Sequence, residues 1–199
     1  MDRTISFFSA EASGPGLADL AGVLCGPGRI ASFGRTAARL SAVIEEPWRA
    51  RALVRECRRR GADAQVHLAD CGRPLVRTSF RVDLLPFASR WRCGDEKAVP
   101  DGFRLSGAML RMWALAGGSQ YGNAYLLAVD PDAPETHERL AAALAPLGVP
   151  ARLLGPKAEL PAIKVTGRRR LECLRELIGD PPPGAEAAWP ELLPARQAG

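Results

Sequence analysis

The chain has 199 residues, enough to bury a hydrophobic core without help from disulfides or metals. Its composition, 47% hydrophobic and 25% charged, is that of an ordinary globular protein and excludes a disordered chain. The net charge of +5 favours an anionic partner, although many basic proteins bind nothing acidic.

Cysteine and histidine usage argues against a metal site. The five cysteines are odd in number, scattered and never spaced as CxxC, and the histidines number only two. We therefore expect reduced thiols, with no disulfide framework, bound metal or cofactor. No run of 18 apolar residues occurs, so neither a signal peptide nor a membrane span is predicted. The expected location is the cytoplasm, away from any membrane.

The predicted elements occur in the same order twice along the chain. The first copy has a helix over 17–25, a strand over 38–44, a helix over 45–61, strands over 64–69 and 75–84, and a polar and apolar face on the last strand. The second copy has a helix over 107–115, a strand over 124–129, a helix within 130–148, strands over 151–154 and 162–166, and a helix over 168–178. An internal repeat of this kind governs the whole fold.

This order predicts an α+β fold of two repeats, each running helix, one or two strands, helix, two strands and helix. Residues 1–84 form the predicted first half, 85–101 a connector, 102–179 the second half and 180–199 a flexible, proline-rich tail.

Small residues mark the first helix of each copy, which lets two helices approach closely. We expect the helix-pair interface to consist of Ala21, Gly22, Gly26, Ala114, Gly117 and Gly118. Alanine and glycine are common in this chain, so recurrence at the same place in both copies is what favours the interface.

The stretches "SFFSAEA", "LADLAGVLCGPGRI", "GAMLRMWALAGGS" and "HERLAAALAPLGVPARLL" carry a family resemblance that covers most of residues 5–179. The chain resembles the LAGLIDADG homing-endonuclease fold and, more closely, the LAGLIDADG-like domain of the WhiA family, bacterial transcription regulators of sporulation and cell division. The resemblance implies two αββαββα-type repeats whose first helices pack at a pseudo-twofold axis, and two antiparallel sheets that form a saddle over DNA. It also implies partners in DNA and the transcription machinery.

The sequence departs from that family at the helix ends. In active members each helix ends with an acid that holds a catalytic divalent metal. The corresponding positions here are Pro27 and Gly117, so no catalytic residue and no cleavage are expected. The regulators also continue into a helix-turn-helix domain. Only 20 residues follow Gly179, so we expect that domain, and its promoter specificity, to be missing.

Basic residues suggest where DNA would lie. Arg168, Arg169 and Arg170 lie at the start of a helix, where the helix dipole disfavours cations. A phosphate bound there would interact favourably with both the dipole and the arginines. The strands add further cations, so the predicted DNA-binding residues are Arg73, Arg77, Arg81, Lys157, Lys164, Arg168, Arg169 and Arg170. For the strand cations, the sequence slightly favours an ordinary solvated sheet face over a DNA contact.

Two other functions stay open from the sequence. One is an active nuclease that uses acids of the connector: Asp95, Glu96 or Asp101. The other is a protein-interaction module that has kept the fold without binding DNA.

Overall fold

The computed structural model describes residues 9–10, 14–154 and 160–191. Each half runs helix, two strands, helix, two strands, helix. The first half contains α1 (Ala21–Cys25), β1 (Arg29–Phe33), β2 (Ala37–Val43), α2 (Pro47–Arg59), β3 (Ala64–Leu68), β4 (Pro74–Thr78) and α3 (Leu85–Arg90). The second half contains α4 (Gly107–Gly117), β7 (Gly118–Tyr121), β8 (Ala124–Ala128), α5 (His137–Ala143), β9 (Arg152–Leu153), β10 (Ala162–Thr166) and α6 (Arg168–Ile178). The predicted αββαββα order is confirmed.

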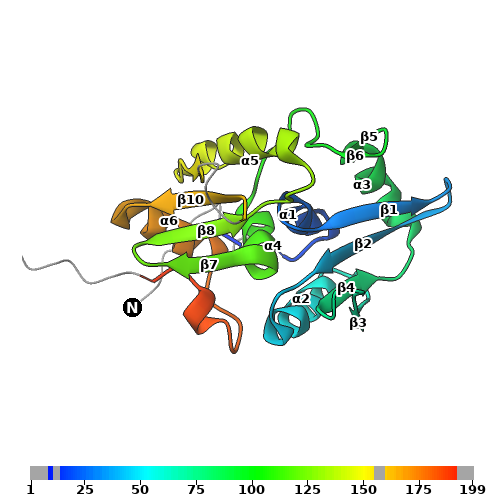
Figure 1. Cartoon of the computed structure of the whole chain (residues 1–199), viewed down its shortest axis with the longest axis horizontal. Helices are drawn as coiled ribbons and strands as arrows, with labels where there is room; N and C mark the ends of the chain where they lie inside the picture. Colours follow the sequence, from blue (N-terminus) through cyan, green and yellow to red (C-terminus); the bar gives the residue numbers. More distant parts are fainter. Residues whose placement is uncertain (1–8, 11–13, 155–159, 192–199) are drawn as a thin grey trace, which may run out of the picture.

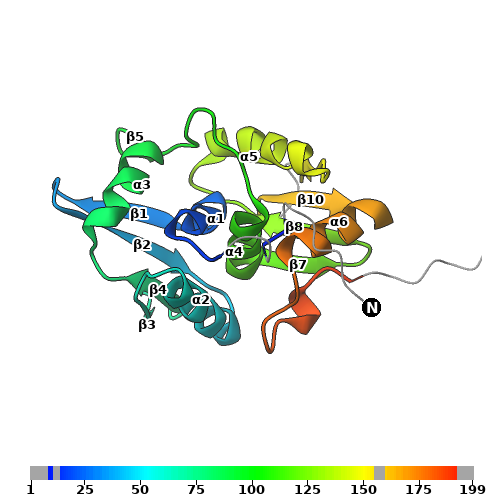
Figure 2. The same ribbon diagram turned by 180° about the vertical axis from the view of Figure 1, so that it is seen from behind.

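The two halves build the same sheet. Within the described residues the strands form two four-stranded antiparallel sheets, ordered β1-β2-β4-β3 and β7-β8-β10-β9. A hairpin of β5 (Arg92–Cys93) and β6 (Glu96–Lys97) lies between the halves in the sequence. Figure 1 shows one sheet on each side of the helices α1 and α4, and Figure 2 shows this arrangement from behind.

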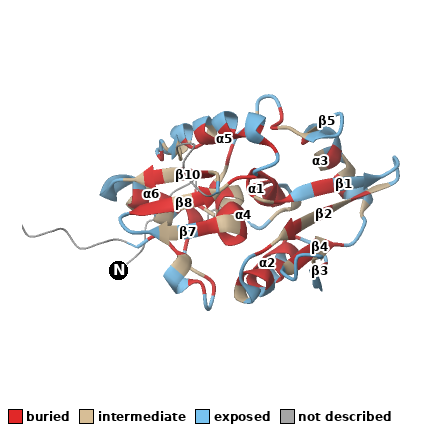
Figure 3. Cartoon of the chain, in the orientation of Figure 1, coloured by how far each residue is buried: buried red, intermediate tan, exposed pale blue. Residues whose placement is uncertain are grey.

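Helices α1 and α4 pack together at the centre of the molecule, where the buried residues concentrate (Figure 3). A Cβ atom on Gly22 would lie 1.8 Å from the carbonyl oxygen of Met109, so only glycine allows this approach. A Cβ on Gly26 would lie 2.9 Å from the Trp113 ring. Ala21 and Ala114 are buried. Gly118, by contrast, is crowded by Tyr125 of its own sheet rather than by α1.

The alternation of side chains along each strand decides which face packs on the helices. On β2, Ala38, Leu40 and Ala42 are buried, while the residues between them are half-exposed. On β8 and β10, Leu127, Ile163 and Val165 are buried in the same way. Each sheet therefore has one face on the core and one face open to solvent.

The strand predicted over 75–84 ends early, at Thr78. The predicted apolar face beyond that point is wrong, because Phe80 is 46% exposed and Val82 is 70% exposed. A short turn over Val82–Leu84 leads directly into α3. In the order of elements, α3 holds the place in the first half that α6 holds in the second, although the sequence assigned its residues to a connector.

Residues 180–191, predicted as part of a flexible tail, pack against the second half. Trp189 is 2% exposed, and its Nε1 donates to the carbonyl of Gly179 at 2.8 Å. The Arg111 guanidinium lies 5.5 Å from the centre of the Trp189 ring. No helix within the described residues combines the length and apolar character needed to cross a bilayer.

Candidate nucleic-acid interface

Three arginines share the open face of the first sheet. Residues paired directly across antiparallel strands point to the same side. Ser41 is paired with Arg29 on one neighbouring strand and with Arg77 on the other, and Arg39 is paired with Ala31. Arg39 lies two positions before Ser41 along β2, so Arg29, Arg39 and Arg77 lie on one face. The sequence predicted only Arg77.

A recess of about 230 Å³ opens around Arg77, and its walls include Arg39, Gln65 and His67. The Nε of Arg77 is buried and has no hydrogen-bond partner in the described part of the chain. The Arg39 guanidinium lies 4.5 Å from the centre of the Phe80 ring, which itself packs 5.9 Å from Phe33. The recess therefore brings the guanidinium groups of Arg39 and Arg77 together beside the Phe80 ring.

The open face of the second sheet carries fewer cations. Lys164 is paired with Leu126 on β8 and with Arg152 on β9, so the two cations point to the same side. Ser119 and Tyr121 of β7 share that face, and Tyr121 is 67% exposed. The second face is thus more hydroxyl-rich and less positive than the first.

Two of the cations that the sequence placed on strands form ion pairs with carboxylates of this chain. Arg73 pairs with Glu45, and its Nε donates to Cys71 Sγ at 3.3 Å. Arg81 binds Asp83 through Nε at 2.8 Å and donates to the Gly61 carbonyl at 2.6 Å. Local ion pairs of this kind reduce the charge that each arginine offers to an anion.

The start of α6 is exposed, as expected for a phosphate contact. Arg168 Nε already donates to Glu172 at 2.8 Å, one turn along the helix, whereas Arg169 and Arg170 have no ion pair among the described residues. Lys157 lies outside the described residues. The assignment of the α6 arginines to DNA stays a prediction.

The C-terminal ends of α1 and α4 lie next to each other. A Cβ on Gly117 would lie 3.4 Å from Cδ of Pro27 and 2.9 Å from Cβ of Ala128. The two positions that the resemblance assigns to catalytic acids are therefore neighbours. Neither side chain can ligate a metal.

A buried arginine closes the end of α4. Arg49, from the first turn of α2, has a side chain only 5% exposed. Its Nη1 donates to the carbonyls of Ala114 at 3.1 Å and Leu115 at 3.3 Å, and its Nη2 donates to the carbonyl of Gly118. The Arg49 Nε is paired with the carboxylate of Glu46, which balances the charge of the guanidinium. The guanidinium thus satisfies carbonyls at the negative end of the helix dipole.

A buried lysine closes the end of α1. Lys97 reaches from β6, and its Nζ donates to the carbonyls of Gly26 at 2.7 Å and Gly28 at 2.8 Å. Asp130 lies 3.4 Å from the same nitrogen and 3.2 Å from Nη2 of Arg29. Burial lowers the pKa of Lys97, and the charge of Asp130 works against that shift.

The connector acids do not assemble a metal site. Asp95 and Glu96 line a cavity of about 440 Å³ together with Asp130. Asp95 is paired with Arg92 at 2.9 Å, and Asp101 is paired with Arg139 at 3.0 Å. Across 9–10, 14–154 and 160–191, no group of three or more His, Cys, Asp or Glu side chains could hold a metal ion.

Comparison with known proteins identifies the fold through structure alone. No protein family model and no curated protein matches the sequence. The homing endonuclease I-WcaI bound to its DNA recognition sequence is similar with a TM-score of 0.60 and 14% identity, over 89% of this chain and 83% of that one. Full-length DUF199/WhiA from Thermatoga maritima has a TM-score of 0.58 and 13% identity, over 82% of this chain.

The N-terminal LAGLIDADG domain of DUF199/WhiA matches with a TM-score of 0.55 and 12% identity, over 82% of each chain. This chain spans 55% of the full-length WhiA protein. The chain therefore has the LAGLIDADG homing-endonuclease fold, as the sequence resemblance implied.

Sequence reasoning missed several side chains that build the site. Arg39 alternates with buried residues in "ARLSAVI", so the period of two could have placed it on the open face. Arg29 is the first residue of β1 and Arg152 the first residue of β9, and neither short strand shows such a pattern. Arg49 and Lys97 carried no signal, because their partners are backbone carbonyls 65 to 71 residues away in the sequence.

Proposed function

We propose that this chain binds double-stranded DNA along the open faces of its two sheets and does not cleave it. The observation that carries the proposal is the pair of Arg39 and Arg77 on one open sheet face, which Arg29 shares although it is ion-paired with Asp130 and Asp132. Arg152 and Lys164 extend the positive charge onto the second sheet. Phosphate neutralisation by such cations supplies most of the affinity of DNA-binding proteins. The similar fold of I-WcaI, which is described bound to its DNA recognition sequence, supports this use.

The absence of cleavage rests on the two helix ends. Two-metal hydrolysis needs carboxylates to hold its ions beside the scissile phosphate. Arg49 and Lys97 instead bring fixed positive charges to both ends and engage the carbonyl oxygens there. Asp130 is a buried carboxylate 3.4 Å from the Lys97 ammonium, and its charge is balanced by Lys97 and Arg29. A divalent ion at either end would meet a like charge at close range.

A protein that holds DNA without cutting it acts by occupying its site. We therefore assign the chain a regulatory role in transcription, related to that of WhiA-like proteins, and take sporulation and cell division as the first processes to examine. The proposed place of action is the cytoplasm. Mapping the DNA that the tagged chain occupies in cells, with transcript levels after deletion, tests this role. Occupancy without any change in transcripts of neighbouring genes would contradict it.

A salt titration tests the DNA contact. A fluorescein-labelled duplex of random sequence is titrated by anisotropy with the wild-type chain, with Arg39→Gln plus Arg77→Gln, and with the control Arg51→Gln on the exposed side of α2. The double variant should lower the log-log salt slope by about one to two units and weaken binding about equally on unrelated duplexes. The control should bind almost as the wild type does. An unchanged slope in the double variant would place DNA elsewhere.

The α6 arginines are tested in the same assay. If Arg168, Arg169 and Arg170 contact phosphates, their joint replacement by alanine should reduce the slope by about one to three units. The variant should also be stabilised by a few tenths of a kcal/mol, about the size of a helix-dipole effect, because it removes cations from a positive helix end. An unchanged slope with lower stability would mean that these arginines serve the fold.

A further inference from the structure

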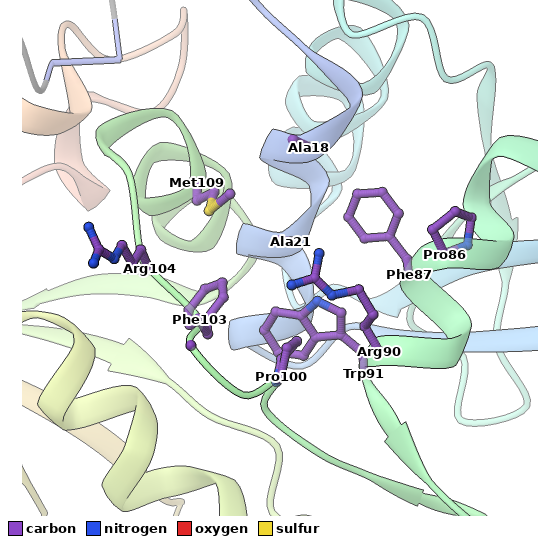
Figure 4. Close-up of a pocket in the computed structure, with 11 residues that line it drawn as sticks. Ala18, Ala21, Pro86, Phe87, Arg90, Trp91, Pro100, Phe103, Arg104 and Met109 are labelled. Carbon is purple, nitrogen blue, oxygen red and sulfur yellow. The ribbon is translucent and has the colours of Figure 1, made fainter.

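An apolar pocket lies at the opposite ends of the central helices from Arg49 and Lys97. Its volume is about 210 Å³, and its lining includes Ala18, Ala21 of α1, Met109 of α4 and the aromatic side chains of Phe87, Trp91 and Phe103. Trp91 and Phe103 meet edge to face, with ring centres 5.2 Å apart. Figure 4 shows these two rings and Phe87 around one opening. The floor of the pocket is therefore aromatic and rigid.

Two arginines without partners flank this pocket. Arg90 and Arg104 line it and are exposed. Figure 4 shows the Arg90 guanidinium above Trp91 and directed towards Ala21. Neither arginine has a hydrogen bond or an ion pair with any described residue. Nearby Arg92 and Arg139 are paired with Asp95 and Asp101. Arg90 and Arg104 thus leave positive charge uncompensated beside an apolar surface.

We propose that this pocket docks a short acidic segment of a partner protein, which inserts one aromatic or branched apolar side chain. The pocket volume of about 210 Å³ favours a single anchoring side chain. Pockets that hold whole drug-sized ligands are larger, about 300–1,000 Å³. A buried anchor in a pocket is the usual centre of a protein–protein contact. Carboxylates of the segment would pair with Arg90 and Arg104, which gives the contact its charge selectivity.

The location separates this contact from the sheets. Ala18 and Ala21 lie at the start of α1, and Met109 lies near the start of α4. Both helices end where the first strand of their sheet begins. The pocket is therefore a helix length away from the sheet-side ends. The docking proposal goes beyond DNA binding and does not rest on it, because the partner and DNA would occupy separate surfaces.

A peptide selection tests the proposal with the full chain. A displayed library of random linear peptides is panned against the protein, and enriched peptides are resynthesised and titrated by anisotropy. The expected peptides carry Asp or Glu within a few residues of Trp, Phe, Leu or Ile. Their binding should weaken about tenfold in Arg90→Ala, as expected for loss of an interfacial charge pair. Arg51→Ala, which removes an exposed arginine of α2, is the matched control and should bind as the wild type does.

A second variant separates the pocket from general charge. Ala18→Phe fills the opening from an exposed position and keeps both arginines, so it should weaken the same peptides at least tenfold. Both variants should give the circular-dichroism spectrum and the thermal unfolding transition of the wild type, which shows that they are folded. Enriched peptides that are basic, or that bind both variants as well as the wild type, would overturn the proposal. Dimerisation of the chain that Ala18→Phe abolishes would assign the pocket to a second copy and would also overturn it.

Discussion

The ends of α1 and α4 occupy corresponding places in the two repeats, yet different cations close them. At α4, one guanidinium from within the first repeat spans the carbonyls of Ala114, Leu115 and Gly118. At α1, one ammonium from the β5–β6 hairpin holds the carbonyls of Gly26 and Gly28 and faces Asp130. A planar fork suits a row of acceptors, and a compact point charge suits a small cluster.

The reason for the difference lies at the start of the second helix of each repeat. In the first repeat that start carries Arg49, which reaches across to α4. In the second repeat it carries His137, whose Nε2 contacts the carbonyl of Asp130 instead of α1. The connector then supplies the missing cation through Lys97. A repeated fold can thus fill equivalent positions from different segments, provided that the charge and the acceptors match.

Breaking the helix pair should disrupt both ends at once. Gly22→Val places side-chain atoms where a Cβ alone would lie 1.8 Å from the Met109 carbonyl oxygen. The helices must separate, and the free energy of unfolding should fall by about 4 kcal/mol, beyond the usual cost of overpacking. Gly14→Ala is the control, because nothing lies within 4 Å of the added atom. Chemical denaturation measures both, and equal stabilities would refute the close approach.

Removing the cation at α4 should be the next largest effect. Arg49→Met leaves buried carbonyls and Glu46 without their partner, so we expect a loss of about 3 kcal/mol. Arg49→Lys should recover only part of this loss, because an ammonium cannot span all three carbonyls. Denaturant unfolding of the wild type, Arg49→Met and Arg49→Lys measures the three stabilities. Full recovery by lysine would mean that charge alone, and not the fork, closes this end.

The cation at α1 should matter less. In Lys97→Met, Asp130 keeps Arg29 as an ion-pair partner, so we expect a loss of about 1 to 2 kcal/mol. The removal of Arg29 and Lys97 together should cost more than the sum of the two single changes, since Asp130 then has neither partner. A strictly additive double-mutant cycle would show that Asp130 does not couple them.

Thiol labelling offers the mildest probe of the α1 end. Cys25 ends α1 and is buried, and this burial raises its pKa; burial likewise raises the pKa of Cys57 in α2 to about 12. Cys71 is exposed, and its hydrogen bond from Arg73 lowers its pKa, so it should react early with iodoacetamide. Loss of the Lys97 charge raises the pKa of Cys25 further, but Lys97→Met loosens the α1 end, so labelling of Cys25 through local opening should be several-fold faster. Labelling of Cys57 should stay unchanged, as peptide mass spectrometry would show. Equal acceleration at both thiols would indicate global destabilisation instead.

Much of the fold was predictable because it is written in local patterns. The small residues around Gly22 and the repeated order of elements indicated the helix pair and the sheets. The candidate site was only partly predictable. Arg77 lies on the open sheet face as its strand parity predicted, but Arg73 and Arg81 are bound by Glu45 and Asp83, which a linear pattern does not reveal. Arg49 and Lys97 act on carbonyls of distant segments, and backbone acceptors leave no mark in a sequence.

The central claim is that the chain holds DNA and leaves it intact. The most direct measurement begins with duplexes selected for binding from a fully randomised pool, so that a rare recognition sequence is represented. These duplexes are saturated with the chain, supplied with Mg²⁺ or Mn²⁺, and resolved on a denaturing gel. The account predicts bound, uncut DNA in both metals. Metal-dependent cutting at a fixed position, lost in Asp130→Asn, would contradict it.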